Sequence, residues 1–98
     1  MKDFTEIKRI ISSHLNEIKE RFGIKEFGIF GSYVRGEESQ ASDLDILVEF
    51  EEGKKTFDNY MELKFYLEDL LNLKVDLVIK SAIKPRLRPY ILEEVVYV

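Results

Sequence analysis

The chain contains no cysteine and has a single histidine, His14, among its 98 residues. Without cysteine it can form neither disulfides nor a thiolate zinc site, and one histidine excludes a histidine-rich metal cluster. No stretch approaches the roughly 20 apolar residues that span a bilayer, and the N-terminal segment, MKDFTEIKRI, mixes acids and bases. These absences predict a cytoplasmic protein and leave a hard cation with oxygen ligands as the remaining kind of metal site.

Positive charge is also in short supply, because 15 Lys and Arg against 19 Asp and Glu give a net charge of −4. Binding to a phosphate backbone depends on cationic side chains that release counterions, so direct binding of nucleic acid is not expected. Hydrophobic residues make up 45% of the chain, and a domain of this length buries roughly 60–65% of its unfolded surface. The composition therefore predicts one folded domain over residues 1–98.

Hydrophobic periodicity predicts the two long helices. Between Phe4 and Phe22 the apolar residues recur at steps of three and four. Asp3 and Glu6 have the spacing of a capping box, and Gly23 suits a left-handed helix end. A second apolar stripe predicts a helix over 56–71, with Thr56 as its N-cap and Asn72 at its end.

Short runs of β-branched and aromatic residues predict the strands. The predicted strands are 24–30, 43–50, 73–79 and 95–98; between the first two lie a turn of helix over 32–36 and a polar loop over 37–42, and a short helix over 90–94 follows Pro85 and Pro89. This order predicts an α/β (α+β) fold with a mixed sheet and helices packed on one face.

Three aspartates in the predicted strands are candidate metal ligands. Asp43 and Asp45 lie two residues apart, so their side chains point to the same face of a strand, roughly 6.6 Å apart along it. Aspartate is a poor strand former and like charges repel, so local propensity gives no reason for the pair. Asp76 lies in the third predicted strand. If that strand lies beside the second, three carboxylates could share a site, and such ligands specify Mg²⁺ or Mn²⁺.

The segment before the aspartate pair predicts a phosphate-binding turn. Gly31 directly follows a strand and allows the backbone to approach a ligand closely. Ser32 begins a turn of helix whose free N–H groups and hydroxyl can hold phosphate oxygens. Arg35, one turn further on, can reach the same phosphates bidentately. Together with the aspartates, these residues predict a triphosphate as the ligand.

Gly31-Ser32, ten intervening residues and Asp43-Leu44-Asp45 resemble the signature of the DNA polymerase β-type nucleotidyltransferases. GSYVRG followed by SDLDILVEF is similar, more closely, to the minimal nucleotidyltransferases (MNT), proteins of about this size that act as antitoxins beside HEPN ribonuclease toxins. The resemblance extends over nearly the whole chain, including KVDLVI, and implies the single-domain polymerase β-like nucleotidyltransferase fold.

The resemblance also implies roles for the matching residues. Asp43 and Asp45 would be the ligands of two Mg²⁺ ions, and Asp76 would be the third carboxylate, near the incoming hydroxyl. Gly31 and Ser32 would grip the triphosphate of ATP. The implied reaction transfers AMP to a hydroxyl and releases pyrophosphate, and in the antitoxin branch the acceptor is a tyrosine of the partner toxin, whose ribonuclease is thereby silenced.

Two other interpretations remain open at this point. The chain could be a binding module that neutralises its partner by contact without catalysis, or a nucleotidyltransferase whose acceptor is a small molecule or an RNA 3′ end. A minimal domain would borrow binding surface from another subunit. The candidate partner surfaces are the C-terminal segment YILEEVVYV and the basic segment KPRLRP, with Lys84, Arg86 and Arg88.

Overall fold

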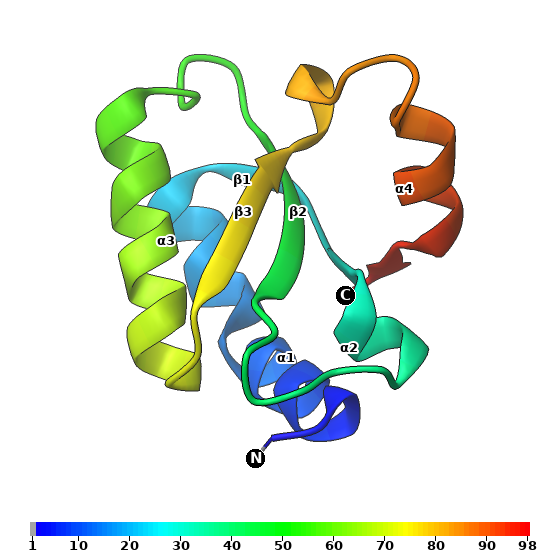
Figure 1. Cartoon of the computed structure of the whole chain (residues 1–98). Helices are drawn as coiled ribbons and strands as arrows, with labels where there is room; N and C mark the ends of the chain where they lie inside the picture. The colour runs from blue at the N-terminus through cyan, green and yellow to red at the C-terminus, as the bar shows by residue number, and fades with distance from the viewer. Residues whose placement is uncertain (1) are drawn as a thin grey trace.

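The computed structural model describes residues 2–98 (Figure 1). The helices are α1 (Phe4–Phe22), α2 (Ser32–Arg35), α3 (Phe57–Leu71) and α4 (Arg88–Glu94), with one 3₁₀ turn, η1 (Lys80–Ala82). The strands are β1 (Ile24–Phe30), β2 (Leu44–Phe50), β3 (Val75–Ile79) and β4 (Val96–Tyr97). The predicted order of elements is confirmed. None of the helices within residues 2–98 combines the length and apolarity that crossing a membrane requires.

The four strands form one mixed sheet in the order β3-β2-β1-β4. β1 pairs with β2 and with β4 in antiparallel fashion, whereas β2 and β3 are parallel. Parallel neighbours need a long crossover connection, and α3 provides it. Because β1 runs against β2 and β3, the end of β1 and the starts of β2 and β3 lie at the same end of the sheet.

The two long helices pack against one face of this sheet, as predicted. Asp3 caps α1 by accepting the Glu6 N–H at 2.9 Å, and Gly23 ends the helix with a φ of 66°. Thr56 caps α3 in the same way, by accepting the Asn59 N–H at 3.2 Å. The main core lies between these helices and the sheet, and it includes Ile7, Ile11, Ile18 and Phe22 of α1, Leu63, Leu67 and Leu71 of α3, and Leu44, Ile46 and Val48 of β2.

α3 also covers the outer edge of β3. Glu68 accepts the N–H of Val75 at 2.9 Å, and the Tyr60 hydroxyl donates to the carbonyl of Leu77 at 2.6 Å. An edge strand with unpaired backbone groups invites pairing with another chain. These two side chains therefore satisfy backbone groups that a neighbouring strand would otherwise bind.

The opposite face of the sheet carries a smaller apolar cluster. Phe30, Leu47 and Ile83 are buried there, with Ile91, Leu92 and Val95 of the C-terminal segment packed against them. Part of YILEEVVYV, a candidate partner surface, is thus packed on the body of the protein as helix and strand. The rest of this face, at the starts of β2 and β3, is left open to the polar residues described below.

Several boundaries differ from the prediction by one or two residues. β2 begins at Leu44, so Asp43 lies just before the strand, and β3 begins at Val75 and not at Leu73. α4 begins at Arg88, two residues before the predicted start, because Pro89 lies in its first turn, where proline is tolerated. These shifts leave Asp45 and Asp76 inside their strands.

Candidate active site

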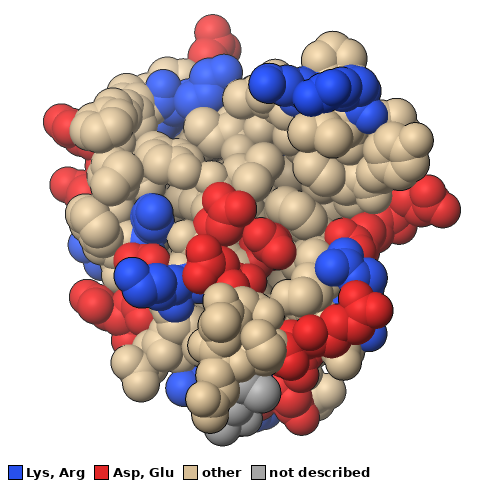
Figure 2. All heavy atoms as spheres, viewed as in Figure 1, with Lys and Arg blue, Asp and Glu red and all other residues tan. Residues whose placement is uncertain are grey.

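Asp45 and Asp76 lie directly opposite each other on neighbouring strands. The parallel register of β2 and β3 pairs these two residues, and Asp45 is also paired with Phe30, the last residue of β1. Leu44 and Ile46, on either side of Asp45, are fully buried beneath the long helices, so Asp45 points to the other face. Figure 2 shows acidic side chains gathered on this face, over the region where β2 and β3 run in Figure 1.

Burial and the neighbouring carboxyl groups change the pKa of Asp45. The pKa of Asp45 is raised to about 6, first by burial and then by the charge of Asp76 and a hydrogen bond with it. The charges of Asp43 and Glu94 raise it further. Since neighbouring negative charge disfavours ionisation, Asp45 takes up a proton more readily than a free aspartate does.

The negative charges of the site also raise the pKa of two nearby tyrosines. The pKa of Tyr33, in α2, is raised mainly by burial, and the charges of Glu38 and Asp43 raise it further. The pKa of Tyr60, in α3, is likewise raised by burial and then by the charge of Asp76. Both phenols therefore stay protonated over a wider pH range than a free tyrosine.

The donor chemistry of the three aspartates fits a hard divalent cation. Within residues 2–98, no three acidic or histidine side chains enclose a point where a metal ion could bind without adjustment. Carboxylate oxygens are nonetheless the ligands that Mg²⁺ and Mn²⁺ prefer. The repulsion that raises the pKa of Asp45 is the interaction that a bound cation would relieve.

Gly31 lies in contact with Asp45, at the junction of β1 and α2. Its φ of 83° and ψ of −156° belong to a region that essentially only glycine adopts. A β-carbon on Gly31 would lie 2.0 Å from Oδ2 of Asp45 and 2.8 Å from its Cγ. Glycine is therefore required here for two reasons, its backbone conformation and the close approach of the aspartate.

α2 is a single short turn that begins at Ser32. The carbonyl of Gly31 accepts the N–H groups of Val34 at 3.1 Å and Arg35 at 3.2 Å. Because the first N–H groups of a helix have no partner within it, those of Ser32 and Tyr33 are left outside the helical bonding pattern. The predicted turn after β1 is thus confirmed, and Gly31, which directly precedes it, lies beside Asp45.

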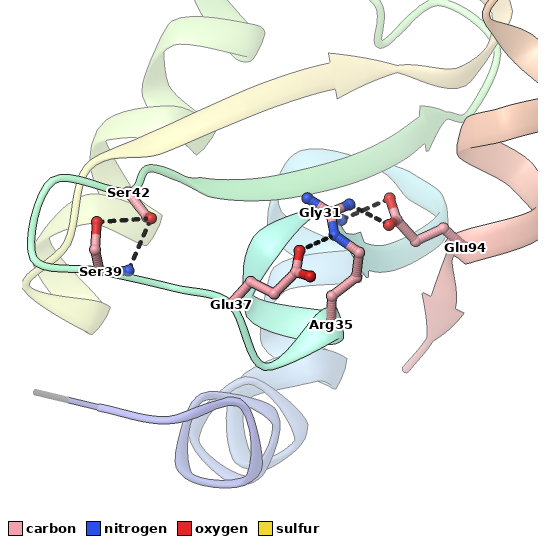
Figure 3. A network of polar contacts seen from close by, with 6 residues as sticks. All are labelled: Gly31, Arg35, Glu37, Ser39, Ser42 and Glu94. Carbon is pink, nitrogen blue, oxygen red and sulfur yellow. Dashed lines mark hydrogen bonds and ion pairs between the residues drawn. The ribbon is translucent and has the colours of Figure 1, made fainter.

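Arg35 is held between two glutamates, one of which lies far away in the sequence (Figure 3). Its Nε donates to Glu37 at 2.7 Å, and its Nη1 pairs with Glu94 at the end of α4. The other carboxylate oxygen of Glu94 accepts the Gly31 N–H at 2.9 Å. Two residues predicted to bind phosphate, Gly31 through its N–H and Arg35 through its guanidinium, are thus both bound to one carboxylate.

The Glu94 contact was missed by reasoning from the sequence. Glu94 lies 63 residues from Gly31, in a segment whose apolar residues indicated only core or partner surface. The local signal was an acidic pair, Glu93-Glu94, between Leu92 and Val95. Such a pair does not reveal which of its members faces a site.

Two serines form a hydrogen-bonded turn at the end of the loop between α2 and β2. Ser42 Oγ accepts the Ser39 N–H at 2.9 Å and lies 3.3 Å from Ser39 Oγ (Figure 3). Side chains of this type form local turns, and this one directly precedes Asp43. The end of the predicted polar loop is therefore held in a defined turn directly before the aspartate pair.

A pocket of about 260 Å³ lies away from the aspartates, and it is lined by Lys55, Thr56, Phe57, Tyr60 and Ile79. Ile79 is the last residue of β3, whereas Asp76 is near its start. The pocket therefore lies towards the other end of the strand, and none of the three aspartates lines it.

Comparison with known proteins agrees with this geometry. The family "Nucleotidyltransferase domain" matches residues 11–98. The chain therefore belongs to the nucleotidyltransferase domain family, as its sequence motifs predicted. It is 51% identical over 98 residues to the protein adenylyltransferase MntA of Thermococcus cleftensis, covering 100% of this chain and 98% of that protein.

Two solved structures share the fold. One, described as "Structure of putative minimal nucleotidyltransferase", has a TM-score of 0.84 and 38% identity and covers 97% of this chain and 95% of its own. The other is an MNT antitoxin in complex with a tri-AMPylated HEPN toxin of Shewanella oneidensis. Its TM-score is 0.66, with 18% identity over 93% of this chain and 70% of that one. The predicted minimal nucleotidyltransferase fold is confirmed.

Proposed function

We propose that this chain is a Mg²⁺-dependent protein adenylyltransferase that transfers AMP from ATP to a tyrosine of a HEPN-type ribonuclease toxin and thereby acts as its antitoxin. The observation that carries the proposal is the register that sets Asp45 opposite Asp76, with Gly31 in contact with Asp45. The carboxylate pair that we propose for metal binding and the turn that we propose for phosphate binding therefore lie at one end of the sheet.

Each residue has a role in the proposed reaction. Asp43 and Asp45 would hold two Mg²⁺ ions, or Mn²⁺ in their place, and Asp76 would be the third carboxylate ligand. Bound Mg²⁺ supplies charge neutralisation at the transferred phosphate and at the leaving pyrophosphate. The N–H groups at Gly31 and Ser32, with the Arg35 guanidinium, bind the triphosphate.

The chemical step is an in-line displacement at the α-phosphorus of ATP. The acceptor oxygen forms a bond to this phosphorus while the bond to the bridging oxygen of the β-phosphate breaks, and pyrophosphate leaves with that oxygen. The proton of the acceptor hydroxyl passes to Asp76, which acts as general base. Positioning and charge neutralisation account for most of the rate in such transfers.

The relatives support a protein as the acceptor, although their names do not specify tyrosine. The MntA of Thermococcus cleftensis is a protein adenylyltransferase, and the related MNT antitoxin lies in complex with a HEPN toxin that carries three AMP groups. An acidic surface also suits a protein partner better than a nucleic acid, because a net charge of −4 repels a phosphate backbone.

Labelled ATP tests the reaction type. With the HEPN-type partner and Mg²⁺ present, label on the α-phosphate should pass to protein and label on the γ-phosphate should not. Asp43→Asn combined with Asp45→Asn should abolish this transfer. Transfer that persists in the double variant would rule out the two-metal site, and transfer of γ-label would indicate a phosphoryl transfer in its place.

One observation favours a second candidate function, an antitoxin that acts by contact alone. The groups proposed to bind phosphate are engaged by Glu94, and no three acidic or histidine side chains within residues 2–98 enclose a metal position. A contact antitoxin would inhibit the toxin equally well without ATP, and the double aspartate variant would retain full inhibition.

A further inference from the structure

Glu94 carries a carboxylate that binds to the proposed phosphate-binding groups. One of its oxygens accepts the Gly31 N–H at 2.9 Å, and the other pairs with the Arg35 guanidinium (Figure 3). We propose that Glu94 is a built-in competitor of the nucleotide, which holds the Gly31 N–H and Arg35 while the site is free and releases them when the triphosphate binds. This inference rests on the proposed function and adds a means by which the same site is regulated.

A carboxylate is suited to this place for the same reason that a phosphate is. A backbone N–H beside a guanidinium presents donors that bind carboxylate and phosphate oxygens with similar geometry. An N–H group has one proton to donate, so the Gly31 N–H cannot fully serve both acceptors. Glu94 also adds negative charge beside Asp45, which would repel a triphosphate for as long as it stays.

The backbone around Glu94 is anchored, so the side chain is the part that moves. Ile91 and Val95 pack on the cluster that contains Phe30 and Leu47. Val95 Cγ1 also lies so close to Gly28 that a β-carbon there would be 2.5 Å away. The Glu94 side chain, by contrast, is 23% exposed, which gives its carboxylate a path to solvent without unfolding of α4.

Arg35 can release Glu94 without losing all its partners. The guanidinium also pairs with Glu37 through Nε, at 2.7 Å. This second contact holds the Arg35 side chain near α2 after Glu94 has left. The Nη1 group that had paired with Glu94 then faces the site with a donor available for phosphate.

Binding of α,β-methylene ATP with Mg²⁺, followed by calorimetry, tests the proposal apart from turnover, because this analogue cannot transfer AMP. Glu94→Gln keeps the shape of the side chain and removes its charge, and Glu93→Gln is the matched control, an exposed residue of the same helix. We expect E94Q to bind the analogue about tenfold more tightly than wild type, since hydrogen bonds to charged groups contribute about that much, and E93Q to bind as wild type does.

The affinity of E94Q for the analogue can also contradict the proposal. Equal or weaker binding by E94Q would overturn the proposal and would make Glu94 a residue that positions Arg35 for phosphate. If wild type, E93Q and E94Q all fail to bind the analogue, the proposed function itself fails and this inference fails with it. Binding by wild type with no gain in E94Q leaves the proposed function intact, so the two failures are distinguishable.

A measurement on the wild-type protein guards against a folding defect in E94Q. The ¹³C resonance of the Glu94 carboxylate reports its hydrogen bonds, and that of Glu93 serves as an internal reference. Saturation with the analogue should move the Glu94 resonance towards that of a solvated carboxylate and leave the Glu93 resonance unchanged. A Glu94 resonance that does not move would show that the carboxylate stays on its donors, against the proposal.

Discussion

Gly31 and Asp45 approach each other so closely that a β-carbon at position 31 would clash with the Asp45 side chain. A β-carbon there would lie 2.0 Å from the Asp45 carboxylate, and the φ of 83° disfavours every other residue as well. One contact therefore joins the turn proposed to bind phosphate to a carboxylate proposed to bind metal. The Gly-Ser turn and the aspartate pair, separated by ten residues in the sequence, form one structural unit.

Gly31→Ala should damage both stability and activity. The backbone conformation at Gly31 costs a residue with a β-carbon about 1–3 kcal/mol, and the new methyl group must also displace Asp45. We expect a lower free energy of unfolding in urea and loss of AMP transfer. Gly36→Ala is the control, since Gly36 has a φ of 72° but no atom within 4 Å of its β-carbon position. Transfer should survive in G36A, and equal activity of the two variants would refute the steric explanation.

The stability of the protein should depend on the protonation of Asp45. Because its pKa is raised from 3.8 to about 6 in the folded state, the folded state holds this proton more tightly than the unfolded state does. The resulting stabilisation is fully present below pH 3.8 and is lost as the pH rises through about 6. Asp45→Asn removes this dependence, so wild type should lose stability relative to the variant across that range. Parallel profiles in denaturant titrations would contradict it.

AMP transfer should fall at acid pH for the same reason. Metal ligands must be deprotonated, and Asp45 takes up a proton as the pH drops through about 6. We expect the apparent affinity for Mg²⁺ to weaken below that pH, so that saturating Mg²⁺ restores part of the lost rate. A transfer rate that stays constant between about pH 5 and pH 8, a range that includes the raised pKa of Asp45, would exclude ionised Asp45 from the rate-limiting step.

Asp76→Asn should reduce transfer while leaving the fold intact. General bases contribute about 100-fold or more to such rates, and loss of a metal ligand adds to the defect. Removing a charge opposite Asp45 also relieves repulsion, so the melting temperature should stay level or rise. Asp69→Asn, on the exposed side of α3, is the control. A variant D76N with near wild-type turnover would remove Asp76 from the mechanism.

Tyr60→Phe tests whether the hydrogen bond from α3 to the edge of β3 stabilises the protein. Loss of the hydroxyl leaves the Leu77 carbonyl without its 2.6 Å donor, which should lower the free energy of unfolding by about 0.5–1.5 kcal/mol. Tyr90→Phe removes a hydroxyl from a side chain that is 74% exposed and should change little. Denaturant unfolding compares the two, and equal values would mean that the Tyr60 bond does not contribute to stability.

Local patterns in the sequence predicted most of this fold. The steps of three and four in α1 and α3 and the caps at Asp3 and Thr56 are properties of neighbouring residues, and the structure confirms them. The parallel pairing of β2 and β3 was expected only conditionally. The sequence order of strand, helix and strand favours it, but the residue-to-residue register of Asp45 and Asp76 depends on tertiary packing.

The part of the candidate site whose residues lie close together in the sequence was predictable. The part that depends on contact between distant segments was not. Gly31, Ser32 and the aspartates share a recognisable spacing. Glu94 reaches the site only because α4 folds back over Phe30 and Leu47. No periodicity near Glu94 indicates this return, since the same apolar pattern would serve a helix packed anywhere on the sheet.

The intact mass of the partner HEPN-type toxin tests the central claim most directly. After incubation with this protein, ATP and Mg²⁺, we predict that the toxin gains one or more AMP masses on tyrosine and loses ribonuclease activity in proportion. The variant with Asp43→Asn and Asp45→Asn should leave the mass and the ribonuclease activity unchanged. A toxin that is inhibited by the wild-type protein while its mass stays unchanged would contradict the account.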